Sequence, residues 1–194
     1  MWKLYSDGGC KPNPGNGSYS AALYKDDALI ESIGGYIGET TNNKAEYKAF
    51  WSGLQLIESH CDYDDQMEIY LDSQLVLNQV SGKWKVKDES LHDVSMMCQA
   101  VVKKFPNMSL LWVKGHSGNE GNNYVDTVCT YFIDKTATIS SASVEREDDK
   151  LWLKCPFSEK DEVKRLGAKW EPKQKKWWVV ADEDNLVTFA KWIS

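Results

Sequence analysis

The sequence predicts an α/β protein in which helices flank a mixed β-sheet, followed by a small α+β domain at the C-terminus. Strand-like segments come first in the chain and then alternate with helical segments, an order typical of a mixed sheet covered by helices. Residues 136–149 are rich in Ser, Thr and acidic side chains and have little to bury. We therefore expect a main domain over 1–135, a linker over 136–149 and a small module over 150–194.

The spacing of apolar residues divides the main domain into strands and helices. Alternating or short apolar runs predict strands at 2–7, 18–25, 28–37, 67–71 and 109–114. Helical spacing predicts helices at 43–60, 73–81, 90–104 and 122–134, the first of them capped by Asn42 or Asn43. Residues 11–17, rich in Pro, Gly and Asn, are expected to form a loop.

The C-terminal module shows two strand patterns, 151–154 and 176–180, and two helical patterns, 158–167 and 182–193. Ser158 followed by Asp161 fits an N-terminal capping pattern for the first helix. A chain of roughly 45 residues is close to the lower limit for independent folding. One interpretation of its aromatic residues is therefore that Trp152, Trp170 and Trp178 form a small core.

Composition excludes several classes of protein. An apolar fraction of 42% suits a folded core, and no apolar run approaches the roughly 20 residues that cross a bilayer. The five cysteines form no CxxC pair, which argues against a disulfide framework and a cysteine–zinc site. We expect a cytoplasmic protein without a signal peptide or membrane partner, in which oxygen atoms bind any metal.

Charge is distributed unevenly along the chain. Residues 1–149 carry 13 Lys and Arg against 22 Asp and Glu, whereas residues 150–194 carry 10 against 7 and hold five of the nine tryptophans. An acidic main domain binds polyanions poorly, because phosphate contacts dominate nucleic-acid affinity. A nucleic-acid substrate would therefore require metal ions in the main domain or attraction by the basic tail.

Four acidic residues occupy unusual positions, three where the predicted elements begin or end and one within the last helix of the main domain. Asp7 and Asp72 each close a strand, Glu46 lies in the first turn of a helix, and Asp126 follows His116 by ten residues. Sites of mixed α/β sheets gather at strand carboxyl ends and neighbouring helix starts. Hard oxygen ligands suit Mg²⁺ or Mn²⁺, and two such ions about 4 Å apart can cleave a phosphodiester.

Each acid also has a purely structural explanation. Glu46 completes a capping box with Asn43, and Asp72 caps the helix that begins at Ser73. Asp7 before two glycines is a common turn acid, and Asp126 is a solvated helical charge. These alternatives are open at the level of single residues.

Taken together, the motifs resemble type I ribonuclease H from residue 2 to about 134. The blocks that carry the resemblance are Tyr5-Ser6-Asp7-Gly8-Gly9, Thr40-Thr41-Asn42-Asn43-Lys44-Ala45-Glu46, Leu71-Asp72-Ser73-Gln74 and Val113-Lys114-Gly115-His116-Ser117-Gly118. The resemblance implies a ribonuclease H-like five-stranded mixed sheet. It also implies an endonuclease that cuts the RNA strand of RNA/DNA hybrids and leaves 5′-phosphate and 3′-hydroxyl ends.

The resemblance also implies roles for individual residues. Asp7 and Asp72 would bridge two divalent cations, Mg²⁺ or Mn²⁺, Glu46 would bind one of them, and Asp126 would complete the second site. His116 would move protons or help product release, a role that its near-neutral pKa allows. All five residues are of the type that the family carries.

Substrate contacts follow from the resemblance in the same way. The positions that match the minor-groove surface of the family are Gly9, Cys10, Asn13, Asn42 and Gln74, and Thr41 matches a position that grips a DNA phosphate. The alternative is that Asn13 shapes its turn and that Thr41 and Asn42 cap the helix.

The sequence departs from many family members after the Asp72-Ser73-Gln74 helix. The long basic, Trp-rich insertion is missing, and only the segment 81–88 remains, as in a compact subgroup of the family. Trp84 and three lysines in this segment are expected to retain a reduced DNA-strand contact, or else Trp84 is a surface residue at a helix end.

The C-terminal module resembles an uncharacterised bacterial domain found beside nucleic-acid enzymes. We expect Trp170, Lys175, Lys176 and Trp177 to hold a nucleic-acid duplex, since aromatic faces and lysines suit stacking and phosphate contact. The expected partner is an RNA/DNA hybrid, and the protein is expected to be a monomer without an obligate protein partner. The alternatives are double-stranded RNA or RNA–DNA junctions as substrate, and a non-catalytic hybrid-binding module.

Overall fold

The computed structural model describes residues 1–115, 119–141, 150–180 and 188–193, and of residues 135–141 and 190 it describes the backbone alone. The chain divides into two compact units, Met1–Thr138 and Ile139–Ser194, which are called the first and second unit below. Among the described helices, none is both long and apolar enough to span a membrane.

The first unit is built on a mixed sheet of five strands, as the sequence predicts. The strands are β1 (Trp2–Lys11), β2 (Gly15–Lys25), β3 (Ala28–Thr40), β4 (Met67–Leu71) and β5 (Met108–Trp112). Their order is β3-β2-β1-β4-β5. Strands β1, β2 and β3 pair antiparallel, while β1, β4 and β5 pair parallel. The parallel half therefore brings the carboxyl ends of its strands to one edge.

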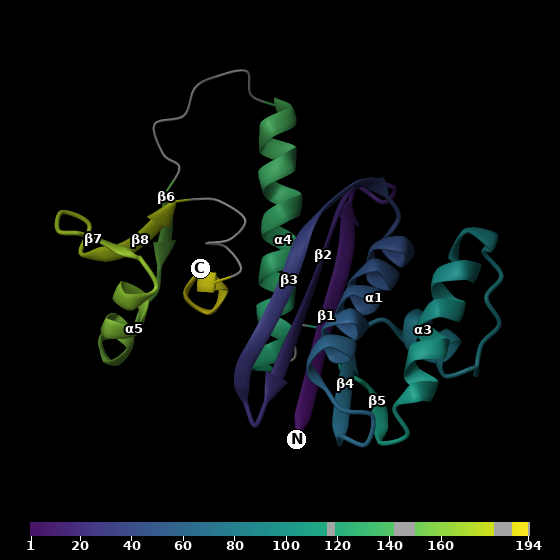
Figure 1. Ribbon diagram of the computed structural model, residues 1–194. Helices are drawn as coiled ribbons and strands as arrows, with labels where there is room; N and C mark the ends of the chain where they lie inside the picture. The colour runs from purple at the N-terminus through teal and green to yellow at the C-terminus, as the bar shows by residue number, and fades with distance from the viewer. Residues whose placement is uncertain (116–118, 142–149, 181–187, 194) are drawn as a thin grey trace. The chain divides into compact units, whose positions relative to one another are not determined.

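Helices cover both faces of this sheet (Figure 1). They are α1 (Asn42–His60), α2 (Gln74–Val80), the short η1 (Glu89–Leu91), α3 (His92–Lys104) and α4 (Glu120–Ser141). Helices α1 and α3 lie on one side and α4 on the other. The main core fills the space beneath α1, with fully buried Leu4, Phe50, Leu54 and Ile69. The burial of these apolar side chains fixes α1 against β1.

The antiparallel strands are longer than the sequence predicts. Strand β1 continues past Asp7 to Lys11, and β2 begins at Gly15, so that only residues 12–14 form the turn. The reason is register, because Lys11 pairs with Asn16 and extends the ladder beyond the apolar pattern. Helix α4 likewise continues six residues into the segment expected as a linker, and residues 142–149 of that segment lie outside the described part of the chain.

Two helix caps differ from the expected ones. The cap of α1 is Thr41, whose hydroxyl oxygen accepts a hydrogen bond from the Lys44 amide at 3.4 Å, in place of Asn42 or Asn43. The cap of α2 is Ser73, whose hydroxyl oxygen accepts from the Val76 amide at 3.3 Å, in place of Asp72. A hydroxyl reaches the free amides of a first turn as well as a carboxamide does.

The second unit is a three-stranded sheet with a short helix. Its elements are β6 (Lys150–Leu153), η2 (Phe157–Glu159), α5 (Lys160–Arg165), β7 (Lys169–Glu171), β8 (Lys176–Val180) and η3 (Ala190–Trp192). The strand order is β6-β8-β7, with both pairs antiparallel. The short strand β7 is absent from the sequence prediction, because its three residues show no apolar alternation and β7 exists only through its pairing with β8.

The capping prediction for α5 is wrong, because the cap is Glu159 and makes no side-chain hydrogen bond. Gly167 follows the end of α5 with φ +104°, a conformation that favours glycine, as expected for the residue that closes the helix. Of the helix predicted at 182–193, residues 182–187 lie outside the described part, and residues 188–189 lead into η3.

The core of the second unit is not the tryptophan cluster that sequence suggests. Its buried residues are Leu153, Val163, Ala168, Val179, Phe189 and Trp192. Trp170 is instead exposed, and Trp152 and Trp178 are only partly buried. The core therefore depends on residues near the end of the chain, which leaves three of the module's tryptophans for other roles.

Candidate active site

Asp7 and Asp72 lie at the same level of two neighbouring parallel strands. The last parallel pair between β1 and β4 is Ser6 with Leu71, so Asp7 is the next residue within β1 and Asp72 is the first residue after the end of β4. The indole Nε1 of Trp112 donates a hydrogen bond to the Asp72 carbonyl oxygen at 3.1 Å and fixes the chain where β4 ends. Sheet topology alone thus brings these two carboxylates together.

Glu46 reaches this edge because α1 approaches β1 closely. A Cβ atom at Gly8 would lie 2.2 Å from the carbonyl oxygen of Ala45, so only glycine permits this contact. The Ser73 hydroxyl donates a hydrogen bond to Glu46 Oε2. Since Ser73 also caps α2, a single side chain holds both the carboxylate and the helix start.

Helix α4 carries Asp126 to the site from the opposite face. A Cβ at Gly121 would lie 2.3 Å from the ring of Tyr5, so the start of α4 packs directly on β1. The Asn119 side chain accepts hydrogen bonds from the amides of Gly121 and Asn122 at the same helix start. One turn beyond Asp126, the Ser18 hydroxyl donates to the Cys129 carbonyl oxygen at 2.6 Å.

The four carboxylates lie close enough to influence one another electrostatically. Burial raises the pKa of Asp7 to about 7, and the negative charges of Asp72, Asp126 and Glu46 add to this increase. A hydrogen bond from the Cys129 thiol opposes it. Burial also raises the pKa of Glu46, the hydrogen bond from Ser73 lowers it, and the charge of Asp72 raises it further. The structure therefore brings together the four acids that sequence analysis singles out.

The chemistry of these side chains fits a divalent cation. Carboxylate oxygens are the ligands that Mg²⁺ and Mn²⁺ prefer, and a cation among them would relieve the repulsion that adds to the effect of burial on the Asp7 pKa. Within the described residues, no group of three or more His, Cys, Asp or Glu side chains is already arranged to hold a metal ion. The carboxylates would therefore have to draw closer together around a bound cation.

The structure excludes the capping explanation for two of the acids. Glu46 forms no capping box with Asn43, because α1 is capped by Thr41 and Glu46 instead accepts from Ser73. Asp72 is not a cap, because Ser73 fills that position. Both carboxylates are thus available for another role. Sequence analysis missed the supporting residues Ser73 and Cys129, although Ser73 stands inside the Asp72-Ser73-Gln74 motif.

The loop after β5 passes beside Asp72. A Cβ at Gly115 would lie 3.4 Å from Asp72 Oδ2. His116, the fifth predicted catalytic residue, lies outside the described residues.

Three predicted substrate-binding residues form one hydrogen-bonded cluster between the β1–β2 turn and α1. The Cys10 amide donates to Asn42 Oδ1 at 2.9 Å, and the Asn42 amide donates to Asn13 Oδ1 at 3.2 Å. Asn42 therefore does not cap α1 but ties the turn to the helix. Gly9, next to Cys10, is partly buried on the same strand.

Comparison with known proteins agrees with this arrangement. Residues 2–132 match the RNase H family. The chain belongs to the RNase H family. Its first unit is therefore an RNase H domain, and residues 150–194 match a family described as a domain of unknown function.

Several relatives of this RNase H domain are ribonucleases H. The ribonuclease H of Ruthia magnifica is 30% identical over 145 residues, which are 70% of this chain and 97% of that protein. The ribonuclease H of Francisella philomiragia is 35% identical over 133 residues, with 63% and 84% of the two chains covered. These matches identify the protein as an enzyme of the ribonuclease H class.

Solved structures support the same fold. The N-terminal RNase H domain of a Mycobacterium tuberculosis protein is 29% identical with a TM-score of 0.64, and the match covers 73% of this chain and all of that one. LC11-RNase H1, solved in complex with an RNA/DNA hybrid, is 28% identical with a TM-score of 0.62. The match covers 71% of this chain and 99% of LC11-RNase H1. The ribonuclease H-like fold class is confirmed.

The remaining predicted contacts of the RNase H domain lie on its surface. Gln74 is exposed at the first position of α2. Trp84 is 50% exposed, and its backbone amide donates to the Asn78 carbonyl oxygen at 2.9 Å. The three lysines around Trp84, at 83, 85 and 87, are also exposed. This short segment offers an aromatic face and positive charge without the longer insertion of other family members.

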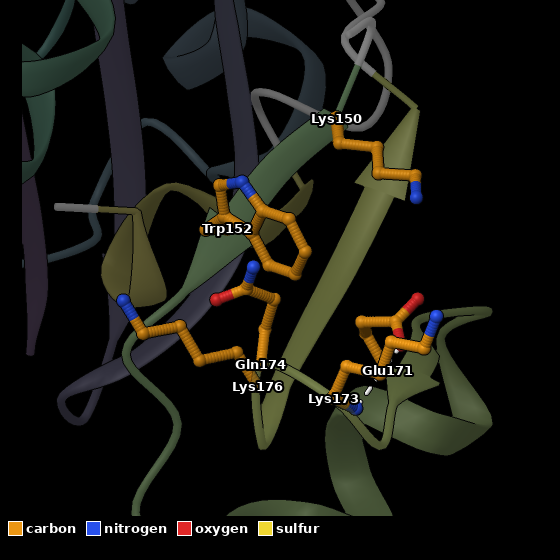
Figure 2. Close-up of a pocket in the computed structure, with 6 residues that line it drawn as sticks. All are labelled: Lys150, Trp152, Glu171, Lys173, Gln174 and Lys176. Atoms are coloured by element: carbon orange, nitrogen blue, oxygen red, sulfur yellow. Dashed lines mark hydrogen bonds between the residues drawn. The ribbon is translucent and has the colours of Figure 1, made fainter.

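The four predicted tail residues Trp170, Lys175, Lys176 and Trp177 line a single groove of the second unit. A second hollow lies against strand β8, lined by residues that include Lys150, Trp152 and Glu171 (Figure 2). Sequence analysis therefore selected residues that the fold does bring together, although its expectation that they hold a duplex stays a prediction.

Proposed function

We propose that the protein hydrolyses the RNA strand of RNA/DNA hybrids with two divalent cations, leaving 5′-phosphate and 3′-hydroxyl ends. The observation that carries this proposal is the convergence of Asp7, Glu46, Asp72 and Asp126 at one edge of the sheet, where burial and the charges of the other three carboxylates raise the pKa of Asp7 to about 7. Without a cation this convergence is a cost to the folded state, so it is poorly explained by stability. The hybrid in the LC11-RNase H1 complex supports the choice of substrate.

In this proposal, Asp7, Glu46, Asp72 and Asp126 hold Mg²⁺ or Mn²⁺. The cations, when bound, supply activation of the attacking water and stabilisation of the leaving oxygen. The hydrogen bonds from Ser73 and Cys129 orient Glu46 and Asp7, and such partners commonly matter for ligand geometry. His116 transfers protons or assists product release.

The same proposal assigns recognition of the hybrid to the cluster around Asn42. The main-chain groups of Gly9 and Cys10 and the side chains of Asn13, Asn42 and Gln74 contact the minor groove, where a 2′-hydroxyl distinguishes RNA from DNA. The hydrogen bonds among Cys10, Asn13 and Asn42 hold this surface in one arrangement before substrate binds. Thr41 contacts a DNA-strand phosphate, and Trp84 with its lysines makes a smaller DNA contact.

Cleavage of a matched set of duplexes tests the proposal. Labelled RNA/DNA, RNA/RNA, DNA/DNA and RNA–DNA junction duplexes are incubated with Mg²⁺, Mn²⁺ or EDTA, and the product ends are mapped. We expect cleavage of the hybrid RNA strand that depends on either cation. Preferred cutting of RNA/RNA or of junctions would contradict the substrate, and binding without cutting under every condition would identify a non-catalytic module.

The substitution Asp72→Asn tests the role of the carboxylates. We expect loss of cleavage with hybrid binding largely retained, because the amide keeps the shape of the side chain but not its charge. Asp64→Asn is the matched control, since Asp64 is an exposed acid in the loop before β4. An Asp72→Asn protein that cuts hybrids as fast as the wild type would refute the metal mechanism.

A further inference from the structure

The second unit contains a groove of about 990 Å³ that the RNase H activity does not explain. Residues of the segment 153–157, of α5 and of the β7–β8 hairpin line it, and it is called the tail groove below. The groove lies within a part of the chain that matches only a domain of unknown function. Its lining combines aromatic rings with lysines.

The aromatic rings of the tail groove are available to a ligand. Phe157 is 83% exposed and Trp170 is 48% exposed. Trp170 and Trp177 meet edge-on with ring centroids 5.4 Å apart, which orients the Trp170 ring. Neither Phe157 nor Trp170 belongs to the core of the unit, which contains Phe189 and Trp192 instead. Folding of the unit therefore gives no reason for these two large apolar rings to be at the surface.

The lysines of the tail groove lack acidic partners. The five lysines that line it are Lys154, Lys160, Lys164, Lys175 and Lys176. Among the described residues, none of them forms an ion pair, and no acidic side chain lines the groove. The Lys160 ammonium instead lies 4.0 Å from the ring centroid of Phe157, which places positive charge beside an exposed ring. Positive charge in the groove is thus left uncompensated, as a site for an anionic ligand requires.

A lysine outside the groove shows the contrast within the same unit. Lys191, which does not line the groove, pairs with both Glu159 and Glu162. Acidic side chains are therefore present in the unit, but Glu159 and Glu162 pair with Lys191, which lies outside the groove.

The neighbouring hollow against β8 differs from the tail groove in its charge and in its rings. It contains the carboxylate of Glu171, and Figure 2 shows the side chain of Gln174 directed towards Trp152. The Lys150 ammonium lies 5.8 Å from the ring centroid of Trp152 and 4.5 Å from that of Trp178. These tryptophans are only partly exposed, unlike Phe157 and Trp170. The hollow shares Lys176 with the tail groove, whereas Lys173 lines the hollow alone and therefore serves as a control.

We propose that the tail groove binds single-stranded nucleic acid, with unpaired bases stacked on Trp170 and Phe157 and phosphates held by the lysines. A duplex covers the faces of its bases, whereas a single strand presents them to aromatic side chains. An acidic polypeptide would satisfy the lysines but would leave the two exposed rings without planar partners. The inference goes beyond the proposed cleavage of hybrids, because it requires neither metal nor catalysis. It also changes the expected tail ligand from a duplex to an unpaired strand.

Binding of the full-length protein to labelled oligonucleotides tests this inference. A fluorescein-labelled oligo(dT) of about 12 nucleotides, a length within the usual range of such sites, is titrated in EDTA and followed by anisotropy. The comparison probes are an abasic strand of the same length, a blunt DNA duplex and polyglutamate. We expect oligo(dT) to bind at least roughly tenfold more tightly than the abasic strand, since stacking contributes per base.

Variants of the groove separate stacking from charge. Trp170→Ala is expected to weaken oligo(dT) binding by roughly tenfold and abasic binding little, while Trp170→Phe retains most of the affinity. Replacing Lys154, Lys160 and Lys164 by Ala should reduce the salt dependence of log affinity by about 0.7 for each phosphate that is no longer neutralised. Lys173→Ala, in the hollow against β8, is the matched control and should change neither quantity.

Several outcomes would overturn the inference. One is the absence of oligo(dT) binding at about 50 mM salt. Another is an affinity for the abasic strand or the duplex equal to that for oligo(dT). A third is that Lys173→Ala weakens oligo(dT) binding as much as Trp170→Ala does. Tighter binding of polyglutamate would assign the groove to an acidic polypeptide instead. Every titration is made in EDTA and so does not depend on cleavage. Failure of the proposed cleavage would therefore not contradict the inference, and failure of oligo(dT) binding would not contradict the proposed cleavage.

Discussion

The two units of the protein differ in the charge of their candidate sites and in where some of their aromatic residues lie. In the first unit Trp2 and Phe50 are buried in the core, and acidic side chains converge at the edge of the sheet. In the second unit Phe157 and Trp170 are exposed, and the lysines beside them lack acidic partners among the described residues. Net charge divides less sharply: it is −6 over the first unit and 0 over the second, because the acidic segment 145–149 belongs to the second unit, whereas residues 150–194 alone carry +3.

This difference suggests a division of labour within one chain. Carboxylates that repel one another are suited to holding cations for chemistry but oppose the approach of a polyanion. Lysines and exposed rings are suited to holding nucleic acid but offer no group for hydrolysis. Changes in the first unit should therefore alter the rate of cleavage, and changes in the second should alter the affinity for substrate.

The largest effect is expected from Asp126→Asn. We expect the kcat for a hybrid to fall by roughly 10³-fold or more, beyond the 10–100-fold loss typical when only a partner of a metal ligand is removed. Oligo(dT) binding by the second unit should be unchanged. Steady-state cleavage and anisotropy measure the two quantities on the same protein. A variant with normal kcat would remove Asp126 from the proposed site.

A matched pair of phenylalanines tests which aromatic residues hold the second unit together. Phe189→Ala should reduce the free energy of unfolding of this unit by about 3 kcal/mol, because Phe189 is fully buried. Phe157→Ala should change it by less than about 0.5 kcal/mol, because Phe157 is at the surface. Urea unfolding, monitored by proteolysis at sites in the second unit, measures the free energy of unfolding of both variants. Equal losses would mean that Phe157 belongs to the core.

The third prediction concerns the cost of the acidic cluster in the first unit. The folded-state pKa of Asp7 is raised from an ordinary 3.8 to about 7. The folded protein thus binds a proton that the unfolded chain has released, and the stability linked to this group falls as pH rises from about 4 to about 7. Asp7→Asn, which has no charge to lose, should be about 2 kcal/mol more stable than the wild type at pH 8 in EDTA.

The pH dependence of that difference provides the check. It should vanish below about pH 4, where Asp7 is protonated in both the folded and unfolded states. Mg²⁺ should raise the Tm of the wild type more than that of Asp7→Asn. Urea unfolding at several pH values, with and without Mg²⁺, measures these quantities. A variant less stable than the wild type at pH 8 would show that repulsion does not dominate at Asp7.

The smallest effect is expected from deletion of residues 146–194. We expect the KM for hybrids to rise by roughly tenfold at moderate salt while kcat is unchanged, because the acidic first unit loses the lysine-rich residues 150–194 that attract phosphate. The increase should be greater for hybrids that carry a single-stranded overhang than for blunt ones. Cleavage kinetics with both substrates measure it, and unchanged kinetics would refute a substrate-holding role for the tail.

Much of the first unit could be predicted from sequence because its signals are local. The apolar periodicity of 43–60 and 67–71 indicates α1 and β4 almost to the residue. Asp7, Asp72 and Glu46 could be selected because they stand at predicted strand ends and a helix start, and Asp126 because it follows His116 in the family's order of motifs. The caps were harder to predict, since Thr41, Asn42 and Asn43 are all good capping residues and only the backbone path decides among them.

The sequence by itself determined which side chains the protein has for its chemistry, the order of its strands and helices, and the opposite charge of its two parts. Only the tertiary structure decided that Ser73 supports Glu46, that Gly8 lets α1 approach β1, and that Phe189 rather than Trp170 is buried. The physical reason is that periodicity is a property of neighbours along the chain. Burial, hydrogen bonding and the pKa of Asp7 instead depend on residues that folding brings together from distant parts of the chain.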